Sequence, residues 1–264
     1  MSGCAHSDHR EPSLTMSNRV VADARLSRVT VQLNECVTRS TITERCSNMS
    51  TTMTQVPFER ARSAAQRDTR VARVIAATYE LLAHSPARTV TLGQIGSAAG
   101  LAKSGVLRYA GSLEALLLRV MYEEHLAWTA SLSAVLAARD GWAPDTLAKA
   151  LARSLAERPI LCDLICTSPV LMGKAGAADR AVVREQGSDI QARLGSCLAP
   201  VLPLTDDDLS MLTAALHAFT GTAWAWSAPH DEGIPVIDDF EATLGALIGT
   251  YIRGITASRP DRRR

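Results

Sequence analysis

Lysine, serine and arginine side chains gather in one short segment of this 264-residue chain. Lys103, Ser104 and Arg108 are spaced so that a helix would carry all three on one exposed face. Lysine and arginine bind phosphate oxygens, and arginine and serine also hydrogen-bond to base edges in the major groove. The segment therefore has the chemistry of a DNA-contacting helix, which we expect over residues 102–109.

The residues before this segment predict a second short helix and a tight turn. Thr91 is a suitable N-cap, since its hydroxyl can accept from a free N–H of the first turn, and Ile95 follows at helical spacing. Gly100 stands where the chain must reverse, and Gly96 lies where the two helices would cross. Two helices joined in this way can place the second one in the major groove. The expected DNA contacts are Thr91, Ala102, Lys103, Ser104, Gly105, Arg108 and Tyr109.

Longer helices are expected on both sides of this pair. Arg67–Ala83 carries an apolar stripe at helical spacing and is ended by Ser85-Pro86. Ser112 can cap a further helix that runs to Ala138, with Glu114 favourably placed in its first turn. A helix of that length starts beside the DNA-contacting segment and ends in the next domain, so it can carry a displacement between them.

Positive charge is concentrated around the motif. Between Arg60 and Arg139 there are ten lysines or arginines against five acids, while the whole chain has a formal net charge of only +1. Clustered basic residues supply the salt-dependent part of DNA affinity. A solvated helical surface without a DNA partner would also carry arginine, so the charge supports the motif without establishing it.

The segment Val71–Leu118 resembles the TetR family of bacterial transcription regulators. The matching residues are Thr91, Ile95, Ala99-Gly100, Tyr109, Ser112 and Glu114. Leu107, Ala110 and Leu113 stand where the family usually has Tyr, Phe and Lys. The run Leu107-Arg108-Tyr109 is most similar to a branch of the family with Leu-Arg-Tyr in its recognition helix. Beyond this segment the similarity is one of layout and length.

The resemblance implies an all-α protein with two domains. Residues 60–112 would form a three-helix DNA-binding domain with a helix-turn-helix, and residues 113–258 a helical ligand-binding and dimerisation domain. It further implies a cytoplasmic homodimer that binds a palindromic double-stranded DNA operator, more often as a repressor, and responds to a small-molecule effector. The alternatives are a helical adaptor that has lost DNA binding and an enzyme. The enzyme is disfavoured because the sequence has no G-x-S-x-G or H-E-x-x-H motif and its histidines are scattered.

The two ends of the chain differ from the rest. Residues 1–55 are rich in Ser, Thr, Arg and Asn without sustained apolar periodicity, so we expect a disordered extension. A start codon assigned upstream of Met49 would explain this stretch, and a regulatory arm is the alternative. Residues 259–264 form a basic tail.

The second domain has apolar spacing that predicts a helix pair. Helices are expected over 144–157, from 158 to an interruption at Ser168-Pro169, over 179–198 after a small-residue loop at 173–178, and in two final segments. Apolar residues in those final segments alternate at spacings of three and four, which predicts a seam between helices and, in a homodimer, a four-helix interface. The alternative is that both stripes are buried inside one subunit. A membrane span over 209–228 is disfavoured by its polar residues. The expected interface residues are Leu209, Leu212, Leu216, Phe219, Leu244, Leu247 and Tyr251.

Large aromatic and sulfur-containing side chains are concentrated in this second domain. They favour an apolar effector held between helices, because no Arg-rich or Gly-rich anion site is present there. The nearest polar candidates are His125, Asp163, Gln186 and His217. Cys162 and Cys166 share a helical face and could hold zinc or sense oxidants, but core packing is the commoner role, and we predict no metal or cofactor. The expected pocket residues are Trp128, Trp142, Cys162, Cys166, Met172 and Trp224.

Overall fold

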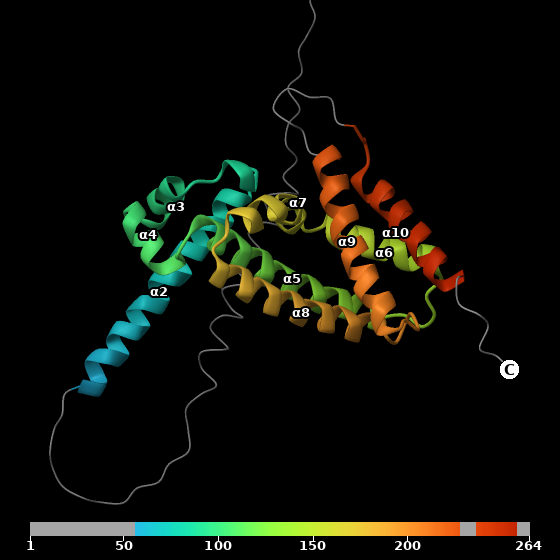
Figure 1. Cartoon of the computed structure of the whole chain (residues 1–264), viewed down its shortest axis with the longest axis horizontal. Helices are drawn as coiled ribbons and strands as arrows, with labels where there is room; N and C mark the ends of the chain where they lie inside the picture. The colour runs from blue at the N-terminus through green and yellow to red at the C-terminus, as the bar shows by residue number, and fades with distance from the viewer. Residues whose placement is uncertain (1–55, 228–235, 258–264) are drawn as a thin grey trace, which may run out of the picture. The chain divides into compact units, whose positions relative to one another are not determined.

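The computed structural model describes residues 56–227 and 236–257, with side chains from residue 65 onward, and in this part of the chain every regular element is helical (Figure 1). The predicted all-α class is thus confirmed for the described residues. The expected disordered extension and basic tail lie outside them. The elements are α2 (Val56–Leu82), η1 (Ala87–Thr89), α3 (Leu92–Ala99), α4 (Lys103–Ala110), α5 (Leu113–Ala137), α6 (Pro144–Ala156), α7 (Pro159–Lys174), α8 (Ala177–Leu198), α9 (Asp206–Ser227) and α10 (Phe240–Ala257).

Helices α2, α3 and α4 pack on one another, and both α2 and α4 contact the first part of α5. Their shared core contains Val74, Ile95, Ala99 and Val106, all of which are buried. α2 begins at Val56, well before the predicted start at Arg67. Ser112 caps α5 as predicted, because its hydroxyl accepts from the Ala115 N–H at 2.9 Å.

The remaining helices form a second apolar core. α5 packs against α7 and α8, and α9 packs against α7 and α10, while α10 also lies along α6 (Figure 1). Trp128, Leu132, Leu151, Leu161 and other side chains from these helices are buried together. α7 thus lies between the long helix that starts beside α4 and the helix pair α9–α10.

α7 runs without interruption through Pro169, so the predicted break at Ser168-Pro169 is wrong. A proline inside a helix leaves the carbonyl four residues earlier without its usual N–H donor. Here the Ser168 hydroxyl donates to the Ile165 carbonyl oxygen at 2.8 Å and takes the place of that donor. The expected small-residue loop over 173–178 is correspondingly reduced to Ala175-Gly176 between α7 and α8.

The helix pair predicted near the end of the chain is present, but its seam lies mainly within one chain. Leu212, Leu216 and Leu244 are at most 2% exposed in the isolated chain. Their own chain already covers these three leucines, so the contact that the structure describes for them is internal, and their part in a subunit interface stays a prediction. Phe219 and Tyr251 make an edge-to-face ring contact between α9 and α10, with centroids 6.1 Å apart. Leu247 is 38% exposed and stays a candidate for contact with a second subunit.

Within residues 56–227 and 236–257, each helix is too short or too polar to span a lipid bilayer.

Candidate DNA-contacting helix and effector-domain interior

The turn between α3 and α4 is fixed by hydrogen bonds and by two glycines. Thr91 and Gln94 form a reciprocal cap: the Gln94 N–H donates to Thr91 Oγ1, and the Thr91 N–H donates to Gln94 Oε1. Gly100 ends α3 in the left-handed region at φ 65°, which disfavours other residues. A Cβ at Gly96 would lie 2.7 Å from the Leu101 carbonyl oxygen, so only glycine permits this close approach.

The outward face of α4 carries the predicted polar residues. Lys103, Ser104 and Arg108 are exposed, whereas Val106 is fully buried beneath them. Because the helix is anchored by Val106 and by the turn before it, these side chains project from a fixed backbone. Thr91 is also exposed, at the start of α3.

Three other predicted contacts have different surroundings. Tyr109 is half-buried, and its hydroxyl accepts from Arg70 Nη1 of α2 at 2.8 Å. Gly105 faces Leu101, since a Cβ there would lie 3.6 Å from the Leu101 Cβ. Ala102 is exposed at the N-cap of α4. The structure thus brings Lys103, Ser104 and Arg108 together on one face and places Tyr109 on the α2 side.

A small hollow lies where α2, α4 and α5 meet. It is lined by apolar side chains that include Val71, Val74 and Ile75 and by Ala110 of α4. Phenylalanine is the residue expected at this position from the family pattern, and a methyl group fills less of the space. The departure at Ala110 therefore leaves the three-helix core less completely packed.

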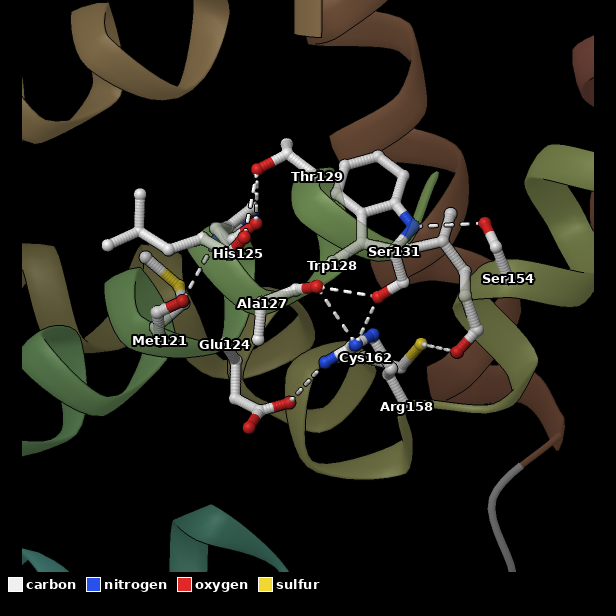
Figure 2. A network of polar contacts seen from close by, with 12 residues as sticks. Met121, Glu124, His125, Ala127, Trp128, Thr129, Ser131, Ser154, Arg158 and Cys162 are labelled. Atoms are coloured by element: carbon white, nitrogen blue, oxygen red, sulfur yellow. Dashed lines mark hydrogen bonds and ion pairs between the residues drawn. The ribbon is translucent and has the colours of Figure 1, made fainter. Parts of the chain in front are cut away.

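The predicted pocket residues have ordinary packing partners. Trp128 is 2% exposed and donates from Nε1 to Ser154 Oγ at 2.9 Å, and buried Cys162 donates to the Leu155 carbonyl (Figure 2). Trp142 is half-buried and donates to the Leu136 carbonyl. Half-buried Cys166 and Met172 lie on α7, and Trp224 makes an edge-to-face contact with Phe240. Their role in effector binding stays a prediction.

Burial raises the pKa of the Cys162 and Cys166 thiols, which favours the neutral, unreactive form. Among the described residues there is no group of three His, Cys, Asp or Glu side chains that could hold a metal ion. Cys162 therefore has the setting of a core side chain, and Cys166 lies half-buried on the same helix.

Two histidines meet in the interior between α5 and α9. The His125 and His217 Nε2 atoms are 3.0 Å apart, and the rings are stacked with centroids 5.0 Å apart. His125 Nδ1 lies 2.8 Å from the Met121 carbonyl oxygen, and His217 Nδ1 lies 2.9 Å from that of Thr213. Burial, reinforced by the neighbouring His217, lowers the pKa of His125 to about 3. His125 is therefore neutral at ordinary pH.

Thr220 lies one turn beyond His217 on α9 and is 1% exposed. Its hydroxyl has no hydrogen-bond partner among the described residues. Helix threonines such as Thr213 and Thr129 instead donate to the carbonyl four residues earlier. An unsatisfied buried hydroxyl costs about 1–3 kcal/mol, so the interior beside α9 holds a polar group that could bind a further partner.

Arg158, at the start of α7, ties that helix to α5. It pairs with Glu124 at 3.5 Å and donates to the Ala127 carbonyl and to Ser131 Oγ at 3.0 and 2.6 Å (Figure 2). Both charged side chains are less than 20% exposed, so the pair is shielded from solvent. The sequence pattern did not single out either residue.

Asp163 of α7 connects α9 with η1, which belongs to the three-helix head (α2, η1, α3 and α4). Its Oδ2 accepts from the Ala87 N–H of η1 at 2.6 Å, and its Oδ1 accepts from Trp224 Nε1 at 3.4 Å. η1 lies just before α3 in the chain. A shift of α9 or α7 would therefore act, through Asp163, on η1 and on the start of the α3–α4 pair.

Residues 122–259 match the family model described as "Tetracyclin repressor-like, C-terminal domain", which covers about half of the 264 residues. The all-helical domain behind the α3–α4 pair is thus that of a TetR-type transcription regulator. The chain belongs to the TetR family.

Solved structures with a similar arrangement are TetR regulators of low sequence identity. A TetR transcriptional regulator from Rhodococcus sp. RHA1 is 16% identical, with a TM-score of 0.49 over 70% of this chain and 97% of that chain. The fatty acid degradation regulator FadR from Bacillus halodurans is 13% identical, with a TM-score of 0.49 over 70% of this chain and 96% of that one. No curated protein matches the sequence.

Proposed function

We propose that the protein is a sequence-specific DNA-binding regulator whose recognition helix is α4, in the branch of the family with Leu-Arg-Tyr at this place. The observation that carries the proposal is the exposed face of Lys103, Ser104 and Arg108 on a helix fixed by a capped, glycine-containing turn. Arg108 is suited to a guanine edge, Lys103 to a phosphate, and Ser104 to either. The DNA backbone beside these contacts would be bound by Thr91, by Ala102 and by the Arg70–Tyr109 pair.

The regulator acts as a homodimer on a palindromic operator, most often as a repressor, in the cytoplasm where the DNA lies. Exposed apolar and small side chains on α9 and α10 support a dimer surface, since Met211, Trp226 and Leu247 are 60%, 49% and 38% exposed. Ala214 and Ala218 are exposed on the same helix as Met211 and allow close approach. Two-fold pairing of such a face would give each dimer two recognition helices.

The first test measures DNA affinity by mobility shift at matched salt, using a site selected from random duplexes. Arg108→Ala should weaken specific binding by about 1–3 kcal/mol, because a base-edge contact is lost. Lys103→Ala should weaken all sequences alike and reduce the salt dependence. Arg184→Ala, an exposed arginine on α8, is the matched control and should bind like wild type. Unchanged affinity in both α4 variants would remove α4 from the DNA contact and favour a helical adaptor.

The effector binds inside the α5–α9 bundle and shifts the spacing of the two heads. The aromatic and sulfur-containing interior supports an apolar body for this molecule, and the His217–Thr220 turn offers a hydrogen-bonding point. The Asp163 link between α9 and η1 is a route by which the head would respond. The ligand needs only to prefer the arrangement that does not bind DNA.

The effector proposal is tested by titrating tryptophan fluorescence with a panel that contains hydrophobic compounds and, for comparison, charged polar ones. An effector should change the emission and release the selected duplex in a parallel mobility shift. Trp128 and Trp224 lie beside the proposed site and serve as reporters. A charged, wholly polar molecule as the one active compound would contradict the apolar pocket while leaving DNA binding intact.

A further inference from the structure

Leu107 occupies an unusual place for an apolar residue. It lies on α4 and is 38% exposed, although the adjacent Val106 is fully buried. The helical positions on either side of it carry Lys103, Ser104 and Arg108, all exposed. The helix uses Val106 and Ala110 for its own packing, so the leucine is not needed there. Leu107 thus stands in the middle of the polar face assigned to DNA.

A DNA surface offers few partners to such a side chain. Phosphates and sugars are polar, and most base edges in the major groove present hydrogen-bond donors and acceptors. The apolar group exposed in that groove is the C5-methyl of thymine. Leucine has no polar atom, so bringing it against a base edge other than thymine would remove water without forming any compensating contact.

We propose that Leu107 is a specificity residue that packs on a thymine methyl in each operator half-site. The inference rests on the proposed DNA binding by α4 and goes further by naming the base that this helix selects. Ser104 and Arg108 flank the leucine and fix its register through their own polar contacts. The position is the one where the family pattern has tyrosine, whose hydroxyl would serve a different contact.

The experiment replaces each thymine of a selected duplex, one at a time, with deoxyuridine, which lacks only the methyl group. The wild-type protein is expected to lose about fourfold in affinity at one position of each half-site, the size expected for one buried methyl. Substitution at the other thymines should change little. The readout is the equilibrium affinity by mobility shift or fluorescence anisotropy at fixed salt.

Variants of the protein identify the residue that reads the methyl. Leu107→Ala should bind the thymine and deoxyuridine duplexes equally, while Leu107→Met, which keeps an apolar side chain of similar length, should retain the preference. Val135→Ala is the control, because Val135 is an exposed valine on α5 away from the recognition helix. It should respond to deoxyuridine as wild type does.

Three results would overturn the inference. If no deoxyuridine substitution weakens wild-type binding, no methyl is read, although the regulator assignment stands. If Leu107→Ala shows the same deoxyuridine effect as wild type, another residue reads the methyl. If no duplex is enriched from the random pool, α4 does not select sequence, and the proposed function falls together with this inference.

Discussion

Leu216→Glu is expected to prevent the second domain from folding, whereas Leu247→Glu is expected to leave it folded and to separate the dimer. Leu216 is 2% exposed in the core shared by α9 with its neighbours, and a carboxylate there would have no partner. Burying an unpaired charge costs several kcal/mol, which is comparable to the whole stability of a domain. Leu247 is 38% exposed, so its replacement leaves the core intact and places charge in the proposed interface.

Circular dichroism and light scattering separate these two outcomes. Leu216→Glu should lack a cooperative thermal transition or be insoluble, while Leu247→Glu should melt near wild type with the mass of a monomer. Val135→Glu, an exposed apolar position on α5, is the control and should keep the wild-type mass. A dimeric Leu247→Glu protein would place the subunit contact elsewhere, and a stably folded Leu216→Glu protein would contradict the internal seam.

Capping and turn preferences of neighbouring residues predicted the α3–α4 turn. The Thr91 cap, the reversal at Gly100 and the close crossing at Gly96 each depend on neighbouring residues, so they can be read from a short segment. The same holds for the cap at the start of α9, where the Thr205 N–H donates to Asp208 Oδ2 and the Asp208 N–H donates to Thr205 Oγ1. The continuation of α7 through Pro169 was not predicted. It is also a local feature, but it depends on the rotamer of Ser168.

The contacts of the second domain were harder to predict from the sequence, because apolar spacing does not determine which helix packs against which. Leu212 and Leu244 fit the spacing of a seam, yet the same pattern serves a contact within a chain and a contact between chains. Which one forms depends on how α6 and α7 cover the helices, and that arrangement is set by long-range packing. The aromatic residues predicted to line a pocket pack in or against the core, and their part in effector binding stays a prediction.

Long-range polar pairs could not be deduced from sequence. His125 and His217 were both named as polar candidates, but they are 92 positions apart and nothing in the local pattern joins them. The same holds for Asp163 and Ala87, which are 76 positions apart. The histidine pairing follows from the packing of both α5 and α9 on α7, and the Asp163 contact follows from the packing of η1 on α7.

The histidine pair has a defined requirement for protons. A carbonyl oxygen can only accept, so the bonds to the Met121 and Thr213 oxygens place a proton on each Nδ1. Burial, reinforced by the neighbouring His217, lowers the pKa of His125, so the His125 ring is neutral. With its proton on Nδ1, the His125 Nε2 atom is an acceptor in the Nε2–Nε2 contact. The nearby Glu124 carboxylate is already paired with Arg158.

Acid should therefore destabilise the protein through His125. In the unfolded chain this side chain titrates near pH 6.5, but in the folded protein its pKa is about 3, so below pH 6.5 the unfolded state binds the extra proton. Stability that is fully present above pH 6.5 is lost as the pH falls toward 3, by about 1.4 kcal/mol per pH unit. His125→Gln, whose side chain does not titrate, should remove this part of the loss. Urea unfolding at pH 7, 6 and 5 measures it.

The difference between wild type and His125→Gln isolates this histidine, because carboxylates and other groups titrate in both proteins. The free energy of unfolding should fall more steeply with acid in wild type, which should lose about 2 kcal/mol more than His125→Gln between pH 7 and pH 5. His84→Gln changes an exposed histidine just after α2 and should follow wild type at every pH. Parallel profiles for wild type and His125→Gln would mean that the buried ring accepts a proton when folded, and the lowered pKa of His125 would be wrong.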